Sequence, residues 1–346
     1  MTQKIIRIAL LWALAVLALP LQAQGFPNKP IRLMLGYSPG GGIDVLSRAF
    51  AQRFGDALGQ QIVFDNKPGA SGAIAADLLI KSAPDGYTLF ISETGYLVFS
   101  QLTPNTPDPL KAFQPVAPIM ALPLLIAVPA DSPAKNTREL IAMLKANPGK
   151  YSFGIPGIGT MHHLGFELFM QLTGINAVHI AYKGSPAIMP DLIGGRLAIG
   201  LLSTTAAAGA EKAGKLRVIA TMTAQRTPMS PDWAALGEIL PKFEATPRIF
   251  FVAPVGTPQA VVERLNEAAR VALSKPDLKE IFEKGGAIPA TATPEELRQQ
   301  IAEDYKRWGE VAKKVGINST NQPGNWPAST LSIRRSGTSH MIATAT

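Results

Sequence analysis

The sequence predicts an α/β protein with two domains, and three observations support this prediction. The chain has 346 residues, of which 47% are hydrophobic, so that two domains can each bury a core. Apolar strand patterns alternate with helical patterns, which is typical of a largely parallel sheet. Two glycine-rich turns, at Gly40–Gly42 and Gly157–Gly159, each join a predicted strand to a predicted helix.

The N-terminus has the features of a secretory signal, predicted to cover residues 1–23. Lys4 and Arg7 precede an apolar run, Ile8–Leu19, which the helix-breaking Pro20 ends. The run is shorter than a membrane-spanning helix needs, so export is favoured over a retained membrane anchor. The chain has no cysteine, which excludes disulfides, a thiolate nucleophile and a lipid-anchored N-terminal cysteine.

The formal net charge of the chain is +8, but basic residues of the two ends contribute part of it (Lys4, Arg7, Arg334 and Arg335). The body is therefore only mildly basic, and it has no Lys/Arg cluster with interleaved aromatic residues. We expect no nucleic-acid partner. A modest positive field favours anionic ligands.

The first glycine-rich turn follows a predicted strand, Ile31–Leu35. Apolar residues then recur at helical spacing from Ile43 to Ala57. The first N–H groups of a helix lack internal partners, so a carboxylate or phosphate can dock at such a turn. A tight turn without a ligand remains the alternative. The turn lacks both a nucleotide P-loop sequence and a dinucleotide fingerprint.

The next elements continue the alternation. We predict a strand at Gln61–Phe64, a helix at Ala73–Lys81 and a strand at Tyr87–Ile91, which ends at Ser92-Glu93-Thr94. Ligands bind at the carboxyl ends of strands in such sheets. The first glycine turn and the hydroxyls of Ser92 and Thr94 are both at such ends.

Two apolar strands in the middle of the chain resemble each other. Leu124–Pro129 and Ile249–Pro254 each continue into a helix, and their prolines keep one offset of 125 residues. We interpret them as two strands that cross side by side between the domains; a chance resemblance of two common strand–helix units is the alternative. We also predict that Pro258 is the first helical residue after a capping Thr257.

The segment between these strands repeats the alternation and contains the second glycine turn. Its predicted elements are strands at Tyr151–Gly154, Val178–Ile180, Leu197–Leu202 and Leu216–Ala220, and helices at Met161–Thr173 and Pro186–Ile193.

The last predicted helix starts with a capping box formed by Thr293 and Glu296, and Gly316 ends it. Residues 318–346 have no acidic residue and no sustained periodicity, so we predict a disordered tail.

Catalytic and metal-binding patterns are weak. The four histidines (His162, His163, His179 and His340) have no His-x-x-x-His or carboxylate cluster at ligand spacing, so no metal and no cofactor is predicted. Ser38, His163 and Asp44 could form a triad on paper, but no Gly-x-Ser-x-Gly elbow supports it. Asp44 caps a helix or holds the glycine loop, with a ligand contact as the alternative. Ser203 and Thr204 either close a strand or line a cleft.

At this point the chain resembles a known family, the Bug-type (TctC-like) extracytoplasmic solute receptors of tripartite tricarboxylate transporters. The resemblance runs from about Phe26 to Ile317. It rests on motifs in a fixed order: Pro39-Gly40-Gly41-Gly42-Ile43-Asp44 with Arg48, Asn66-Lys67-Pro68-Gly69-Ala70, Ala83-Pro84-Asp85-Gly86-Tyr87-Thr88-Leu89, Phe153-Gly154, Gly159-Thr160-Met161-His162-His163-Leu164, Tyr182-Lys183-Gly184, Asp191-Leu192-Ile193-Gly194-Gly195 and Gly214-Lys215-Leu216-Arg217.

The resemblance implies a two-lobed periplasmic binding protein fold (type II-like), with two crossing hinge strands and a ligand cleft between the lobes. The first lobe is expected at residues 24–126 and 250–317, and the second at 127–249. The resemblance implies a periplasmic, monomeric receptor without enzymatic activity, which captures a small organic carboxylate and delivers it to membrane permease subunits. A secreted hydrolase or transferase, and a periplasmic sensor protein, are the alternatives.

The family's ligand contacts, carried over by motif, fall on loop N–H groups and small hydroxyls at both glycine turns and both strand ends. With Asp44 and Thr204, they form the predicted ligand-binding set: Tyr37, Gly40, Gly41, Gly42, Asp44, Ser92, Thr94, Gly157, Gly159, Thr160, His163, Ser203 and Thr204.

The sequence departs from the family pattern in the second lobe. The run Ile155-Pro156-Gly157-Ile158 replaces a more polar run, and Ala198 and Leu202 stand where acidic residues are common. These departures are expected to make that side of the cleft more apolar. They favour a dicarboxylate or an aromatic carboxylate over a simple amino acid.

Overall fold

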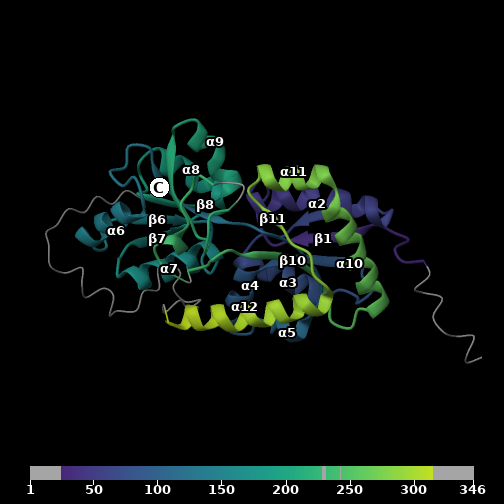
Figure 1. Cartoon of the computed structure of the whole chain (residues 1–346). Helices are drawn as coiled ribbons and strands as arrows, with labels where there is room; N and C mark the ends of the chain where they lie inside the picture. Colours follow the sequence, from purple (N-terminus) through teal and green to yellow (C-terminus); the bar gives the residue numbers. More distant parts are fainter. Residues whose placement is uncertain (1–24, 228–230, 242, 315–346) are drawn as a thin grey trace, which may run out of the picture.

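The chain folds into two mixed β-sheets, each with helices packed on both faces, in a computed structural model (Figure 1). The structure describes residues 25–227, 231–241 and 243–314, so the predicted signal peptide and C-terminal tail lie outside it. No helix within those ranges combines the length and the apolar character needed to cross a membrane.

The first sheet has the strand order β11-β4-β10-β3-β1-β2. β1 pairs in parallel with β2 and β3, whereas β10 runs antiparallel to both β3 and β4. Its strands are β1 (Ile31–Leu35), β2 (Ile62–Asn66), β3 (Thr88–Glu93), β4 (Phe113–Ala121), β10 (Arg248–Pro254) and β11 (Ile288–Pro289).

The second sheet repeats this pattern, with the order β7-β6-β8-β5-β9. β6 pairs in parallel with β7 and β8, and β5 runs antiparallel to β8 and β9. Its strands are β5 (Leu124–Pro129), β6 (Ser152–Ile155), β7 (Val178–Ala181), β8 (Ile199–Ser203) and β9 (Leu216–Thr221). The prediction of largely parallel sheets is therefore right for three adjacent strands of each sheet and wrong for the strands next to the crossings.

The helices cover both sheets because neighbouring strand residues are buried on opposite faces. Ile31 and Leu33 pack with α2 and α10 on one face of the first sheet, and Met34 packs with α3 and α12 on the other. The helices are α2 (Gly42–Leu58), α3 (Ala73–Ile80), α4 (Thr94–Leu102), α5 (Pro109–Ala112), α6 (Thr137–Ala146), α7 (Met161–Thr173), α8 (Ser185–Ile193), α9 (Thr204–Lys212), α10 (Gln259–Ser274), α11 (Pro276–Lys284) and α12 (Pro294–Lys314), with short 3-10 turns at Ala70–Gly72 and Leu236–Glu238.

The chain passes between the sheets twice, and the two passages are neighbours. β4 and β5 are separated only by Leu122 and Pro123, and the return passage enters β10 through Pro247. The Leu122 N–H donates to the Pro247 carbonyl at 3.2 Å. The two strands predicted to cross between the lobes, β5 and β10, lie in different sheets. The chain crosses just before each of them, which is earlier than the predicted lobe boundaries at residues 126 and 250.

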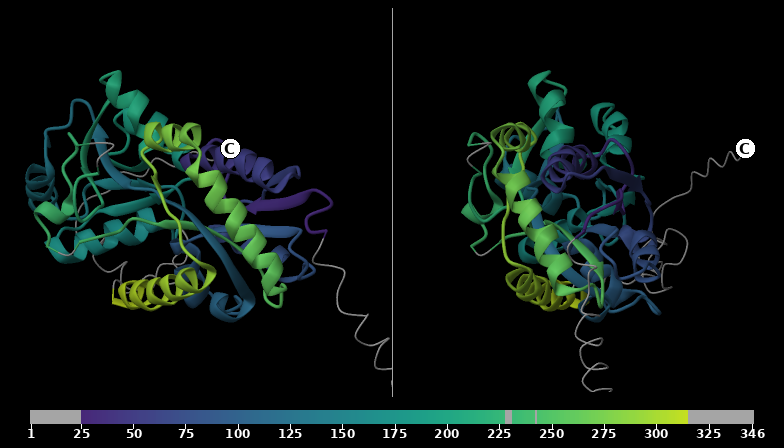
Figure 2. Two further views of the ribbon diagram at one scale, coloured as in Figure 1. Left: turned by 45° about the vertical axis from the view of Figure 1, so that its right-hand side comes forward. Right: turned by 90° about the vertical axis from the view of Figure 1, so that its right-hand side faces the viewer.

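The last helix, α12, contacts the cores of both lobes. Leu297 and Ile301 pack in the first lobe, whereas Trp308 and Ala312 pack in the hydrophobic core of the second. α12, drawn in yellow, accordingly runs below the first sheet and reaches the second lobe in Figure 1 and in the left view of Figure 2. It is therefore a bridge between the lobes and not part of the first lobe alone.

The starts of α12 and α10 were both predicted from the sequence, and the structure agrees with only the first. The capping box is confirmed, since the Glu296 N–H donates to the Thr293 hydroxyl and the Thr293 N–H donates to the Glu296 carboxylate. α10 instead begins at Gln259, one residue later than predicted. The Thr257 hydroxyl donates to the Pro254 carbonyl and does not cap the helix.

Candidate ligand-binding site between the lobes

Four helices begin at the carboxyl ends of neighbouring strands, two in each lobe. α2 and α4 follow β1 and β3, and α7 and α9 follow β6 and β8, so the two lobes present equivalent pairs. The N-cap side chains of α2, α7 and α9 accept no hydrogen bond from their helices, whereas at α4 the Glu93 carboxylate lies against the Gly95 N–H. The first N–H groups of α2, α7 and α9 therefore combine the positive end of the helix dipole with a lack of N-cap partners.

The two lobes touch at these helix starts. A Cβ atom on Gly42 would lie 2.2 Å from the Thr205 hydroxyl oxygen and 2.7 Å from that of Ser203. The Ser71 hydroxyl donates across the lobes to the Ile158 carbonyl at 2.8 Å. Ser71 and the preceding Ala70 have positive φ angles, of 51° and 48°, which non-glycine residues rarely adopt. Neither Ser71 nor Thr205 belongs to the predicted ligand-binding set.

The first glycine turn is held by Asp44. Gly40 has a φ of +82°, and its N–H donates to the Asp44 carboxylate at 3.0 Å. Asp44 also accepts from Asn66 at 2.7 Å and pairs with Arg48 at 3.1 Å. Its carboxylate is buried, and both of its oxygens have partners. This favours the prediction that Asp44 holds the glycine loop over the prediction that it contacts a ligand.

The second glycine turn is held by Thr160 and His163. The Thr160 hydroxyl donates to the Gly157 carbonyl at 2.8 Å, and the Gly159 N–H donates to His163 Nδ1 at 3.3 Å. Gly159 has a φ of +77°. The Thr160 hydroxyl hydrogen is therefore committed to its own loop, and His163 orients that loop.

The small hydroxyls at the strand ends differ in their partners. Ser92 Oγ is buried without a hydrogen-bond partner among the described residues. Thr94, in contrast, donates to Asp304 at 3.2 Å and accepts from the Arg248 N–H at 3.1 Å, so its hydroxyl joins the crossing segment to α12.

In the second lobe, the predicted hydroxyls contact each other or the crossing. Ser203 and Thr205 share a hydrogen bond of 3.0 Å, and the Thr204 hydroxyl donates to the Pro123 carbonyl at 3.4 Å. Thr204 therefore closes the strand next to the crossing, whereas Ser203 faces Gly42 of the first lobe.

Glu93 lies between Ser92 and Thr94 but is not in the predicted ligand-binding set. Its side chain is buried and accepts a hydrogen bond from the Tyr37 hydroxyl. Burial raises the pKa of Glu93, against the hydrogen bonds from Tyr37 and from the Gly95 backbone, which lower it. Burial and the neighbouring Glu93 raise the pKa of Tyr37 well above its usual value.

His163, Glu167 and His179 form a polar cluster behind the second turn. The sequence analysis overlooked the i, i+4 spacing of His163 and Glu167, whose Nε2 and Oε1 atoms lie 3.5 Å apart; His179 Nδ1 lies 4.0 Å from the same oxygen. The Gly159 N–H donates to His163 Nδ1, so this nitrogen already has a partner and Nε2 is the atom that lies toward Glu167. The three side chains bring one possible ligand atom each within 4.8 Å of one another, a spacing that the sequence pattern did not indicate, and His163 Nε2 has no hydrogen-bond partner among the described residues.

Three of the residues that depart from the family pattern pack in the hydrophobic core of the second lobe. Ile155 and Leu202 are fully buried in hydrophobic clusters, and Ala198 packs against one of them. The expectation that these residues make the site more apolar is therefore wrong for Ile155 and Leu202.

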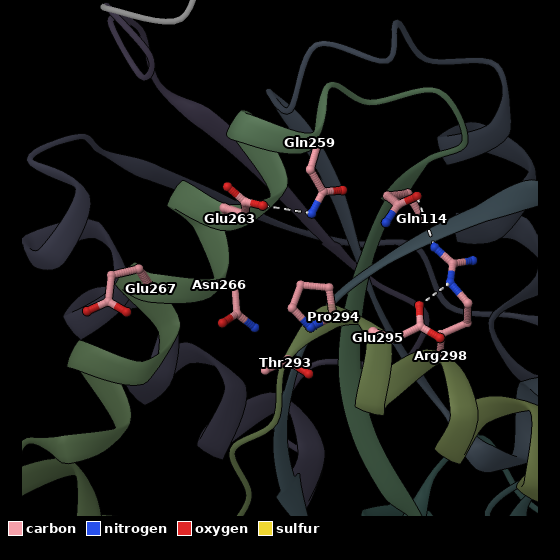
Figure 3. Close-up of a pocket in the computed structure, with 9 residues that line it drawn as sticks. All are labelled: Gln114, Gln259, Glu263, Asn266, Glu267, Thr293, Pro294, Glu295 and Arg298. Atoms are coloured by element: carbon pink, nitrogen blue, oxygen red, sulfur yellow. Dashed lines mark hydrogen bonds and ion pairs between the residues drawn. The ribbon is translucent and has the colours of Figure 1, made fainter.

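Two cavities of the structure lie elsewhere, on the first lobe. One, of about 510 Å³, lies between the starts of α10 and α12 beside Gln114 (Figure 3). The other, of about 780 Å³, lies along α2 and β2. Neither cavity includes a residue of the second sheet, so neither is the predicted interlobe site.

Comparison with known proteins agrees with this architecture. The family described as "TctC: Tripartite tricarboxylate transporter family receptor" matches residues 46–317. The protein BugT of Bordetella pertussis is 34% identical over 322 residues, covering 91% of this chain and 98% of BugT.

Two solved structures share the fold. Rpa4515 of R. palustris, solved with adipate, is 30% identical with a TM-score of 0.80, covering 85% of this chain and 99% of that one. MatC (Rpa3494) of Rhodopseudomonas palustris, with bound malate, is 26% identical with a TM-score of 0.76, covering 83% and 99%. The chain therefore belongs to the tripartite tricarboxylate transporter receptor family, a family of two-lobed periplasmic solute receptors and not of enzymes.

Proposed function

We propose that this chain captures a small organic carboxylate between its lobes and delivers it to the membrane subunits of a tripartite tricarboxylate transporter. The observation that carries the proposal is that four helices, α2, α4, α7 and α9, begin where the lobes touch, and that α2, α7 and α9 have no side-chain cap. Such termini attract anions, because their N–H groups and their dipoles both favour negative charge.

The ligand contacts fall into two groups. The N–H groups that open the four helices, together with the Ser92 hydroxyl and Ser203, are the proposed direct contacts. Asp44, Thr160 and His163 hold the two glycine turns in place, and Thr94 holds the crossing segment.

We infer that the ligand is a dicarboxylate. Each lobe supplies one pair of helix starts, which suits a molecule with an anionic group at each end. The relatives with bound adipate and malate support this class. An aromatic carboxylate has less support, because the apolar residues that favoured it pack in the core.

The experiment is titration calorimetry with malate and adipate, each compared with its diamide. The dicarboxylates are expected to bind and the diamides to bind much more weakly, because helix starts discriminate charge. At a hundredfold excess over Kd, the ligand should also raise the unfolding free energy by about 2.7 kcal/mol. Equal affinity for acid and diamide, or chemical conversion of the recovered ligand, would contradict the proposal.

We further propose that the protein is exported through the signal peptide at residues 1–23 and acts in the periplasm as a monomer. The basic residues and the apolar run before Pro20 support the proposed export. Fractionation of cells that express the full chain, with size measurement of the released protein, tests both points.

A further inference from the structure

Glu93 places an acidic side chain at the surface where the lobes meet. It is the last residue of β3 and precedes α4, and its side chain is buried. The point where a Cβ on Gly95 would stand lies 2.3 Å from Glu93 Oε1 and 3.3 Å from the carbonyl oxygen of Gly159 in the other lobe. The carboxyl group therefore lies within a few ångströms of the second lobe's glycine turn.

No cation compensates this carboxyl group among the described residues. Tyr37, from the loop after β1, contacts it as a neutral hydrogen-bond donor. Charged groups on the neighbouring elements are engaged with one another: Asp44 pairs with Arg48 beside the first turn. Asp304 pairs with Arg248 beyond Thr94. On the side of the second lobe, His163 is held by the Gly159 N–H.

The hydrogen bond from Tyr37 distinguishes the two carboxyl oxygens of Glu93. The Tyr37 hydroxyl donates to Oε1, which is the carbonyl oxygen of the neutral acid in this arrangement. The proton of the neutral acid then belongs on Oε2, while the Gly95 backbone N–H lies against the same carboxyl group and lowers its pKa. Burial disfavours the ionised form and raises the pKa of the group.

We propose that Glu93 is a neutral carboxylic acid in the ligand-bound receptor and donates its O–H to a ligand carboxylate, so that each ligand is captured with one proton from solvent. This inference rests on the proposed carboxylate-binding function. An ionised Glu93 has only acceptor oxygens and would repel an anion, whereas the neutral acid forms a charge-assisted hydrogen bond. Glu93 is then a specificity-determining contact within a site otherwise built of backbone N–H groups and the hydroxyls of Ser92 and Ser203.

The test is titration calorimetry of malate and adipate in buffers of different ionisation enthalpy. The slope of observed heat against buffer enthalpy gives the protons taken up per ligand. We expect uptake approaching one proton in the natural protein wherever free Glu93 is ionised, and a Kd that rises up to tenfold per pH unit there. Glu93→Gln retains a neutral donor, so it should bind without proton uptake and with a Kd independent of pH.

Asp304→Asn is the matched control, since it removes a second buried carboxyl group that is paired with Arg248 and lies outside the ligand contacts. It should leave the proton uptake unchanged. Equal uptake by the natural protein and Glu93→Gln would overturn the role of Glu93 while leaving the carboxylate receptor intact.

Binding by the natural protein without uptake at every pH, up to the alkaline limit at which the protein stays folded, would also overturn the inference, and this measurement holds even if Glu93→Gln fails to fold. If neither dicarboxylate binds the natural protein or the variant, the proposed function itself fails, and the inference fails with it.

Discussion

At the residue scale, Ser92 and Thr94 flank Glu93 but have opposite surroundings. Ser92 Oγ is buried without a partner, whereas the Thr94 hydroxyl makes two hydrogen bonds. Ser92→Ala should weaken malate or adipate binding by roughly 10- to 150-fold, because a hydrogen bond to a charged group contributes about 1.5–3 kcal/mol. Calorimetric titration measures the loss, and the unfolding free energy should stay constant or rise.

Thr94→Val provides the contrast on the same strand end. It leaves the Arg248 backbone N–H and the Asp304 Oδ2 atom without the Thr94 hydroxyl, so the unfolding free energy should fall by about 1–3 kcal/mol. If Ser92→Ala is destabilised as much and binds normally, its hydroxyl has a structural partner and not the ligand.

The neutral His162 makes stability depend on pH. Burial lowers its pKa from 6.5 to about 3, so the unfolded chain holds one more proton between these values. This contribution to stability is present above the unfolded pKa and is lost as the pH falls from about 6.5 toward 3, at up to about 1.4 kcal/mol per pH unit. His162→Leu should make the acid limb shallower by that slope in denaturant titrations at several pH values.

In His162→Leu, His179 should account for part of the pH dependence of the unfolding free energy that remains, because burial and His163 lower its pKa to about 4. An acid limb of His162→Leu as steep as that of the natural protein would show that His162 is not neutral in the fold.

Local pattern predicted the glycine turns and the loop-holding alternative for Asp44, because these depend on neighbours in sequence. It did not find Glu93, Ser71 or Thr205. Their significance comes from partners far along the chain, such as Ile158 for Ser71 and Gly42 for Thr205. A single acidic or hydroxyl residue at a strand end carries no periodic signal.

At the scale of elements, the start of α2 must approach the start of α9 closely. Gly42→Ala places a Cβ 2.2 Å from the Thr205 hydroxyl oxygen, so it should block the closed arrangement. We expect affinity for malate or adipate to fall at least tenfold with the unfolding free energy nearly unchanged, because a ligand binds more weakly when its competent state is less populated. Calorimetry and denaturant unfolding test the two parts.

Gly209→Ala, on α9, is the control because nothing lies within 4 Å of its Cβ position. It should bind normally and be slightly more stable, since alanine favours a helix over glycine by up to about 1 kcal/mol. A Cβ on Gly41, in the same turn, would meet only the Ser38 carbonyl at 3.8 Å, so this position is a poor choice for a crowding variant. Normal binding by Gly42→Ala would mean that the lobes need not close this tightly.

Elements with strong local signals were predicted best. The strand before each glycine turn, the helix after it and the capping box of α12 all agree with the structure. β4, α4, α9 and α11 were not predicted. β4 is buried on both faces and contains two prolines, so its pattern resembles neither an alternating strand nor a helix.

At the scale of the whole molecule, the two passages of the chain and α12 are the connections between the lobes. We expect saturating malate or adipate to reduce the radius of gyration in solution scattering, because the lobes close about the passages near Leu122 and Pro247. Gly42→Ala should show a smaller reduction. A radius that stays constant while the ligand binds would indicate that the lobes are already in contact without it.

Two domains were predicted from length and apolar content, the two-lobed fold from the family resemblance, and two crossing strands from the repeated proline offset. The exact places of the crossings and the bridging position of α12 were not predicted. Both depend on which core the side chains enter, as Trp308 does by packing in the second lobe, and helical periodicity alone does not distinguish one core from another.

The position of β10 in the first sheet also governs the order of assembly. β10 lies between β3 and β4, yet it follows the entire second sheet in the chain. During synthesis from the N-terminus, the second lobe can therefore complete its sheet first, because all its strands lie between the two passages. Until β10 arrives, β3 and β4 are both left with an unpaired edge, and such edges favour mispairing. The half of the molecule that is made first is thus the half that is finished last.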